Sequence, residues 1–187
     1  DVRSKTLLAS GFDARVNKFH EGNFHWNILK VFALEGTFQR GQKSVAADYT
    51  TGRNYAIEYY LVKPSFSYQP STSFRLTLET RYSDKKNVDG EKAIVREMGI
   101  RLKYNQVEKG SLQGSFALVS ISYDGNSSSS LGFEMLESLK PGKNFTWNAG
   151  YQRSISKNLQ ISFQYNGRKS ESNKTIHSGG MEVRAFF

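Results

Sequence analysis

The chain has 187 residues, no cysteine and a formal net charge of +9, so neither a disulfide framework nor a thiolate metal site is possible. Only 37% of the residues are hydrophobic while 13% are aromatic, and this aromatic content argues against a disordered chain. No run approaches the roughly 18 consecutive apolar residues of a membrane helix, but the strands of a membrane barrel need apolar residues only at every second position. The composition therefore excludes a helical membrane span and permits a barrel.

The first 24 residues permit two interpretations. Residues 7–16 fit either an additional strand or part of a lead-in on the periplasmic side of a membrane. Residues 25–38 follow, and their apolar run at 31–34 would also suit a short helix. Gly36 and the turn residues that come after it favour a strand, and we interpret the segment in that way.

Alternation of apolar and polar residues predicts the other strands, because side chains of a strand point to opposite faces in turn. It is clearest near the end of the chain, where Phe145, Trp147 and Tyr151 alternate with polar residues. Counting from residue 25, we predict eight strands: 25–38, 54–68, 73–83, 92–104, 111–123, 144–153, 158–167 and 177–187.

The predicted connections alternate between short and long, which is typical of an outer-membrane barrel with turns on one side and loops on the other. The short connections are 69–73, 105–110 and 153–158. The long polar ones are 39–53, 83–92, 124–143 and 167–176. The predicted fold is therefore all-β, an antiparallel up-and-down transmembrane β-barrel over residues 25–187. It has eight strands, or ten if residues 1–24 contribute.

A soluble β-sandwich or lipocalin-like barrel also has alternating strands, with its apolar face inward. Aromatic residues near the strand ends favour the membrane barrel, since they would form two girdles at the membrane interfaces. These aromatic residues are Trp26, Tyr68, Tyr82, Tyr104, Tyr123, Phe145, Trp147, Tyr151, Tyr165 and Phe187.

The last residues carry a family resemblance. Met181, Val183, Ala185 and Phe187 share one face of the final strand, and the last of them is aromatic. This resembles the C-terminal recognition strand of Gram-negative outer-membrane proteins. The resemblance implies that the barrel assembly machinery binds these four residues by strand addition at an open sheet edge.

A second resemblance covers about the last 50 residues. The stretches 139–147, 158–170 and 183–187 are similar to the C-termini of large, uncharacterised envelope proteins of Bacteroidota. This likeness implies location in the outer membrane rather than any particular activity.

Charged residues within the predicted strands are expected to face a polar lumen. An eight-stranded barrel is just wide enough for its interior side chains to fill it, so these charges must pair with one another. We expect Arg81 to pair with Glu97 across the 83–92 hairpin, and Arg96, on the outward face, to reach anionic lipid headgroups. The predicted lumen charges are Arg75, Glu79, Arg81, Glu97, Arg101, Lys103, Glu182 and Arg184.

Other chemistry has weak support in the sequence. The three histidines do not form a catalytic or metal-ligating pattern, so we expect no enzymatic centre, no metal site and no cofactor. The positive charge is spread over loops, turns and strands, so nucleic-acid binding is not expected. Residues 131–139 have apolar residues three and four apart, which predicts either a short amphipathic helix that caps the barrel or docks a partner, or an extended strand.

The sequence thus predicts an integral protein of the cell outer membrane that serves as a membrane anchor or as a subunit of a larger envelope complex for secretion, surface display or uptake. Its expected partners are outer-membrane lipid, the barrel assembly machinery and other envelope proteins. A narrow outer-membrane channel and a soluble ligand-binding β-barrel are the alternatives.

Overall fold

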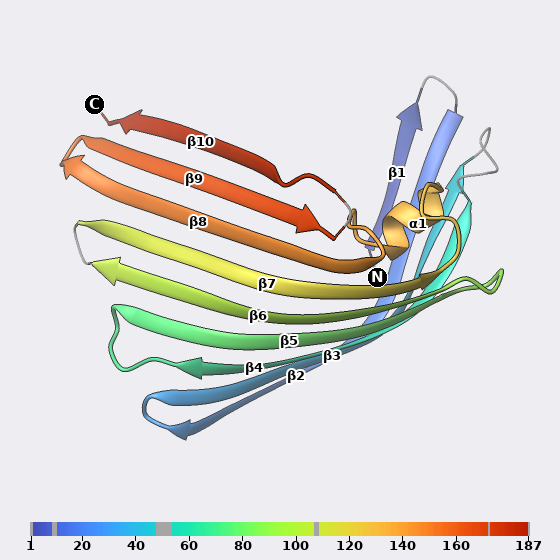
Figure 1. Ribbon diagram of the computed structural model, residues 1–187, viewed down its shortest axis with the longest axis horizontal. Helices are drawn as coiled ribbons and strands as arrows, with labels where there is room; N and C mark the ends of the chain where they lie inside the picture. The colour runs from blue at the N-terminus through green and yellow to red at the C-terminus, as the bar shows by residue number, and fades with distance from the viewer. Residues whose placement is uncertain (1, 9–10, 48–53, 107–108, 172, 187) are drawn as a thin grey trace.

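In the computed structural model, the chain forms one ten-stranded antiparallel sheet in which each strand pairs with the next along the sequence (Figure 1). The structure describes residues 2–8, 11–47, 54–106, 109–171 and 173–186. The elements are β1 (Val2–Leu8), β2 (Gly11–Leu29), β3 (Phe32–Ala47), β4 (Tyr55–Tyr68), β5 (Phe74–Asn87), β6 (Lys92–Gln106), β7 (Gly110–Asp124), α1 (Ser130–Met135), β8 (Gly142–Ser156), β9 (Leu159–Ser170) and β10 (Ile176–Ala185). The all-β, up-and-down architecture predicted from the sequence is confirmed.

The count of eight strands is wrong, and the alternative of ten is right. Residues 25–38 do not form one strand, because β2 ends at Leu29 and β3 begins at Phe32 after a two-residue turn. The apolar run that suggested continuity crosses this turn. Residues 2–8 and 11–24, for which a lead-in was one interpretation, are β1 and most of β2 in the same sheet.

The long loops predicted from the sequence are shorter in the structure. Most of 39–53 belongs to β3 up to Ala47, and residues 48–53 lie outside the described part of the chain. The 83–92 connection is reduced to a tight hairpin because β5 continues to Asn87 and β6 begins at Lys92. Among the connections that the structure describes in full, 125–141 is the long one, and it contains α1. Strand length was underestimated because the strands continue beyond the point where apolar residues stop.

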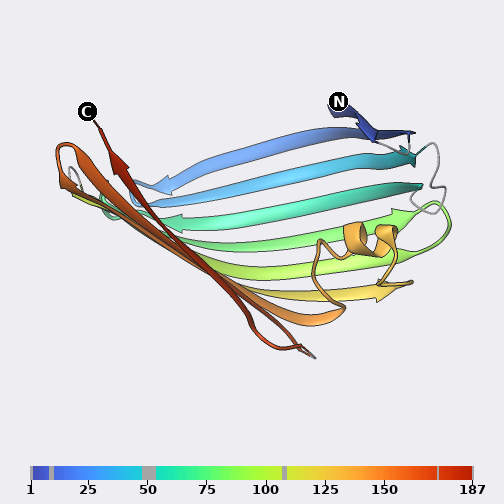
Figure 2. The ribbon, with the colours of Figure 1, turned by 90° about the horizontal axis from the view of Figure 1, so that it is seen from above.

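The register places two kinds of side chain on opposite faces of the curved sheet. Leu78 pairs with Ile100 and Ile100 with Phe116, so these apolar residues share one face, whereas Arg81 and Glu97 pair on the other. The segment with α1 lies in the concavity of the sheet, on the face that carries the charges (Figure 2). We call this the concave face and the apolar one the convex face.

One predicted girdle residue lies on the wrong face. Tyr123 pairs with Ala93 on the concave side, where its hydroxyl donates a 2.6 Å hydrogen bond to Glu91. It was misassigned because Val119 and Ile121, in the same row of β7, are apolar too, and this apolar row packs against Leu136 on the concave side. Phe187, the last residue of the predicted girdle and assembly signal, lies outside the described residues.

The buried apolar core is small and lies where α1 packs on the sheet. Leu136 packs against Val95, Val119 and Ile121. Met135 belongs to a second cluster with Ile57 and Ala93. The short helix predicted within 131–139 is therefore present, and it is the main element that covers the concave face.

The described sheet is open. β1 and β10 each pair with one neighbour, and no pairing joins them in the described residues. β1 is short and covers only the Gly11–Asn17 end of β2, so the edge of β2 beyond Asn17 has no strand beside it among these residues. The closed barrel predicted from the sequence is thus not seen.

Close packing on the convex face fixes the identity of one glycine. Gly167 in β9 pairs with Trp147 in β8, and the indole ring lies directly over it. A Cβ at position 167 would overlap this ring, whereas a Cβ at Gly180 in β10 would meet no atom within 4 Å. The two positions therefore form a matched pair for substitution.

We expect Gly167→Ala to lower the free energy of unfolding by about 1–3 kcal/mol, because the ring must move off its site. Gly180→Ala should change it by less than about 0.5 kcal/mol. Urea unfolding followed by tryptophan fluorescence measures both. Equal effects of the two substitutions would show that the ring does not rest on Gly167.

Candidate functional site

The 125–141 segment contains a short helix that is capped at its start and packed on the concave face at its end. Its helix begins after Ser129, whose hydroxyl accepts a 2.8 Å hydrogen bond from the backbone of Gly132 and so caps one free N–H group. At the other end, Met135 and Leu136 are almost fully buried against the sheet. Six residues are too few for a stable isolated helix, so packing and capping hold it.

The backbone after the helix places a carboxylate over the sheet. Glu137 and Ser138 have φ angles of 54° and 64°, the left-handed conformation that residues other than glycine rarely adopt. Such strain persists only where surrounding contacts outweigh it. Here the contacts are those of the Glu137 side chain.

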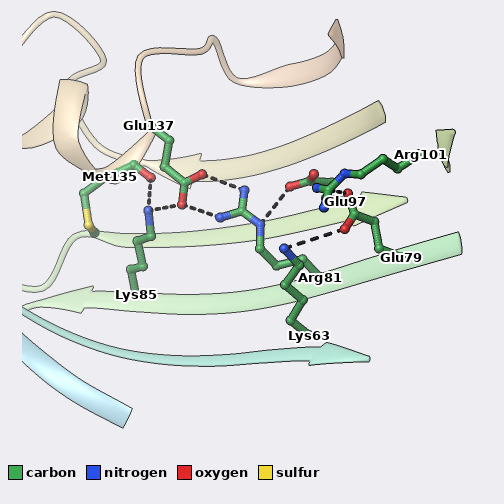
Figure 3. A network of polar contacts seen from close by, with 8 residues as sticks. All are labelled: Lys63, Glu79, Arg81, Lys85, Glu97, Arg101, Met135 and Glu137. Carbon is green, nitrogen blue, oxygen red and sulfur yellow. Dashed lines mark hydrogen bonds and ion pairs between the residues drawn. The ribbon is translucent and has the colours of Figure 1, made fainter. Parts of the chain in front are cut away.

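Glu137 binds two cations of β5 (Figure 3). Both of its oxygens accept hydrogen bonds from the guanidinium of Arg81, at 2.6 and 3.0 Å, in the forked geometry that makes such pairs strong. Lys85 donates to the same carboxylate at 2.7 Å and to the carbonyl of Met135 at 3.1 Å. The Glu137 side chain and the Met135 carbonyl therefore both hold the loop on the concave face of the sheet.

The network continues along the concave face. Arg81 also donates to Glu97 at 2.8 Å, so this guanidinium joins two carboxylates. Further from the loop, Glu79 accepts a 2.9 Å hydrogen bond from Arg101 and lies 3.7 Å from Lys63. Figure 3 shows these residues in a row over neighbouring strands.

The predicted lumen residues are brought together only in part. The Arg81–Glu97 pair expected across the hairpin is present, and Glu79 pairs with Arg101. Arg75 instead donates to the amide oxygen of Gln69 at 2.8 Å.

The other three predicted residues stand apart from this network. Among the described residues Lys103 has no ion pair. Glu182 and Arg184 pair with each other at 2.7 Å on the exposed strand β10. Of the predicted set, four residues therefore belong to the central network, two form a separate pair on β10, and Arg75 and Lys103 belong to neither.

Sequence reasoning missed the residues that join the loop to the sheet. Glu137 lies 56 residues from Arg81, and Lys85 was not selected. Lys63, which pairs with Glu79 within the sheet, was also missed. A second pair of the same kind joins Glu134 of α1 to Lys43 at 2.9 Å. The available signal was the spacing of Glu134 and Glu137, which places two acids on one side of a predicted amphipathic segment.

The histidines take part in local contacts only. His25 lies 3.3 Å from Glu35, and the Nδ1 atom of His177 is 2.8 Å from the hydroxyl of Tyr165. Within the described ranges, no three His, Asp or Glu side chains gather closely enough to hold a metal ion. No helix in this part of the chain is long and apolar enough to cross a membrane.

The chemistry of the central network is attachment rather than proton transfer. Burial would raise the pKa of Glu137, but the hydrogen bonds from Arg81 and the charge of Lys85 outweigh it and lower the pKa to about 2. A carboxylate held in this way stays ionised at neutral pH and serves as a fixed anchor for the loop.

Comparison with models of known families, with curated proteins and with solved structures gave no significant match. Function must therefore be inferred from the sheet itself.

The lowered pKa of Glu137 gives a pH prediction. Its contribution to docking is fully present above the ordinary pKa of 4.5 and is lost as the pH falls toward 2. The chain has no cysteine, so a spin label at Phe133→Cys, an exposed position of α1, reports docking alone. The label should stay immobilised from pH 7 to about 4.5 and become mobile nearer pH 2.

Two variants control this experiment. Glu137→Gln should make the label more mobile at pH 7 and remove the acid transition. Glu182→Gln, in the exposed pair of β10, should leave the profile unchanged. A Glu137→Gln profile identical to that of the unsubstituted chain would contradict a role of Glu137 in docking.

Proposed function

We propose that this sheet is part of the wall of a β-barrel in the outer membrane, with its convex face toward lipid and its concave face toward a polar lumen. The observation that carries the proposal is a band on the convex face, from β2 to β10, in which no residue is charged. In the middle of the sheet it comprises Leu76, Leu78, Ile100, Leu102, Phe116 and Leu118.

The charges of the convex face lie beyond the edges of this band. On the convex face of β5, uncharged residues run from Phe74 to Tyr82 and charged ones begin at Asp84. The interval is about nine residues, which is the length that a tilted strand needs to cross the hydrocarbon of a bilayer. Lys18, Arg40, Glu58, Asp84, Lys86, Lys92, Arg96, Asp124, Lys143 and Lys169 lie at the end near α1, and Arg153 lies at the opposite end.

The solvent-accessible surface is large for a molecule of this mass, which supports contact of the sheet with a surrounding apolar phase. Its accessible surface is 12760 Å², whereas a compact monomer of this mass exposes about 9,100 Å². Large side chains such as Met98, at 67% exposure, and Leu78, at 51%, contribute to the excess. A continuous apolar surface of this kind is rarely left in water.

The distribution of polarity disfavours a soluble ligand-binding barrel. Such a barrel has its apolar side chains inside. Here the concave face carries Glu79, Arg81 and Glu97, and most of the buried apolar side chains lie at the contact with the α1 segment. The arrangement fits a wall with lipid outside and water or polar protein inside.

The open edges support the role of anchor or subunit. Unpaired strand edges are not tolerated in lipid, so both edges of this sheet must meet other strands. β10 presents such an edge, with Met181, Val183 and Ala185 on its convex side. We assign it to strand pairing, with the barrel assembly machinery during insertion and with other envelope protein thereafter.

A narrow channel is the second candidate. A cavity of about 430 Å³ beside the docked loop is lined by polar residues that include Lys43, Arg81 and Glu137. Single-channel conductance separates the two functions, because an anchor plugged by this loop gives none.

Location is tested by fractionation of the full-length protein. We expect it to remain with the membrane until detergent is added and to migrate differently on gels before and after heating. Recovery in the buffer-soluble fraction would overturn the proposal.

The lipid-facing role of the band is tested by a matched pair of substitutions. Leu78→Arg, at the centre of the band, should lower the free energy of unfolding in lipid vesicles by about 2–4 kcal/mol. Ile94→Arg, on the same face but among the charged residues, should cost about 0–1 kcal/mol. If both substitutions are nearly neutral, the face is in water.

A further inference from the structure

The charged residues of the convex face near α1 fall into two groups. From β2 to β5, cations and acids are mixed, since Lys18, Arg40 and Lys86 share the surface with Glu58 and Asp84. From β6 to β9, the border of the apolar band carries three cations and, beside Lys143, the acid Glu171. The cations are Arg96, Lys143 and Lys169, which we call the basic triplet.

The register brings the basic triplet together. Arg96 lies opposite Ser120, and Ser120 lies opposite Lys143 on the next strand. Two strand spacings separate the backbones of Arg96 and Lys143 by about 10 Å, a distance that the two long side chains can span toward a common anion. Lys169 follows one strand further, opposite Phe145.

The members of the triplet are exposed, and none forms an ion pair within the described ranges. Glu171 is the acid that hydrogen-bonds to the triplet. Its carboxylate accepts a 3.3 Å hydrogen bond from the backbone N–H of Lys143. On the concave face, Arg81, Lys85 and Lys43 are instead neutralised by glutamates. With the acid Glu171 beside it, the triplet keeps a net positive charge for an external partner.

Apolar side chains adjoin the triplet on the side of the band. Met98, Leu118 and Phe145 form one row on the convex face. Lys169 pairs with Phe145 on the next strand. Met98 is 67% exposed and Leu118 37%. A molecule that contacts both the basic triplet and these apolar side chains must have an anionic head and an apolar chain.

We propose that the basic triplet binds the headgroup of a phosphorylated membrane lipid whose acyl chains lie along Met98, Leu118 and Phe145. This inference rests on the proposed function, since it requires the convex face to be in a bilayer. A phosphomonoester carries up to two negative charges and three acceptor oxygens, which suits three cations and the hydroxyl of Ser120.

The two tryptophans of the chain allow a local test. Trp147 lies on the convex face two residues from Phe145. Trp26 lies on the same face but on β2, several strands away from the triplet. Trp26→Phe leaves a reporter beside the triplet, and Trp147→Phe leaves one distant from it. Each variant is placed in phosphatidylcholine bilayers, and quenching by brominated phosphatidic acid is compared with quenching by brominated phosphatidylcholine.

At Trp147, we expect phosphatidic acid to bind at least roughly five-fold more strongly than phosphatidylcholine, the factor that about 1 kcal/mol from a single cation implies. The ratio should approach one when Arg96, Lys143 and Lys169 are all replaced by glutamine, and it should be near one at Trp26. Replacing Arg40 and Lys86 by glutamine should leave the ratio at Trp147 unchanged.

The outcomes separate the two proposals. Equal quenching by both brominated lipids at Trp147, or a ratio that survives loss of the triplet, overturns the lipid site and leaves the membrane wall intact. No quenching of Trp147 by either lipid overturns the membrane wall itself.

Discussion

The structure depends on one constraint, the two-residue alternation of side chains across a sheet in which each strand pairs with the next from β1 to β10. The register shifts at Asn27–Leu29 and Ser154–Ser156 lie next to hairpin turns. Over the middle of the sheet the register holds, so that Leu78, Ile100 and Phe116 share one face while Arg81 and Glu97 share the other. A slip of one position on β6 would place Arg101 and Lys103 among Leu78 and Phe116. The polarity of the two faces therefore fixes the register and the fold together.

The faces have different requirements for stability. On the concave face, charged groups are partly withdrawn from water and must be paired, and the docked loop supplies Glu137 to complete the set around Arg81 and Lys85. Unpairing one member would leave a poorly solvated charge, so the loop and the wall stabilise each other. On the convex face, the apolar band has no cover within the described sheet, and its stability depends on the surrounding phase.

The sequence predicted local pairing well and distant contacts poorly. Arg81 and Glu97 were predictable because both belong to one hairpin whose alternation defines the register. The turn between β2 and β3 was missed because apolar residues continue through it. The contact of Glu137 with Arg81 depends on a left-handed backbone and a loop that folds inward, and neither leaves a periodic signal. A closed barrel was predicted from the alternation of short and long connections and from the strand count, and neither determines how the edges of the sheet meet.

The central claim is that the convex face lies against lipid, and scanning spin labels along β6 tests it most directly. Single cysteines at 95–103 can each be labelled, since the chain has no other cysteine. In bilayers, oxygen accessibility should rise at Met98, Ile100 and Leu102 and fall at the residues between them, where a water-soluble nickel reagent should gain access. Nickel accessibility that is equally high on both faces would contradict the account.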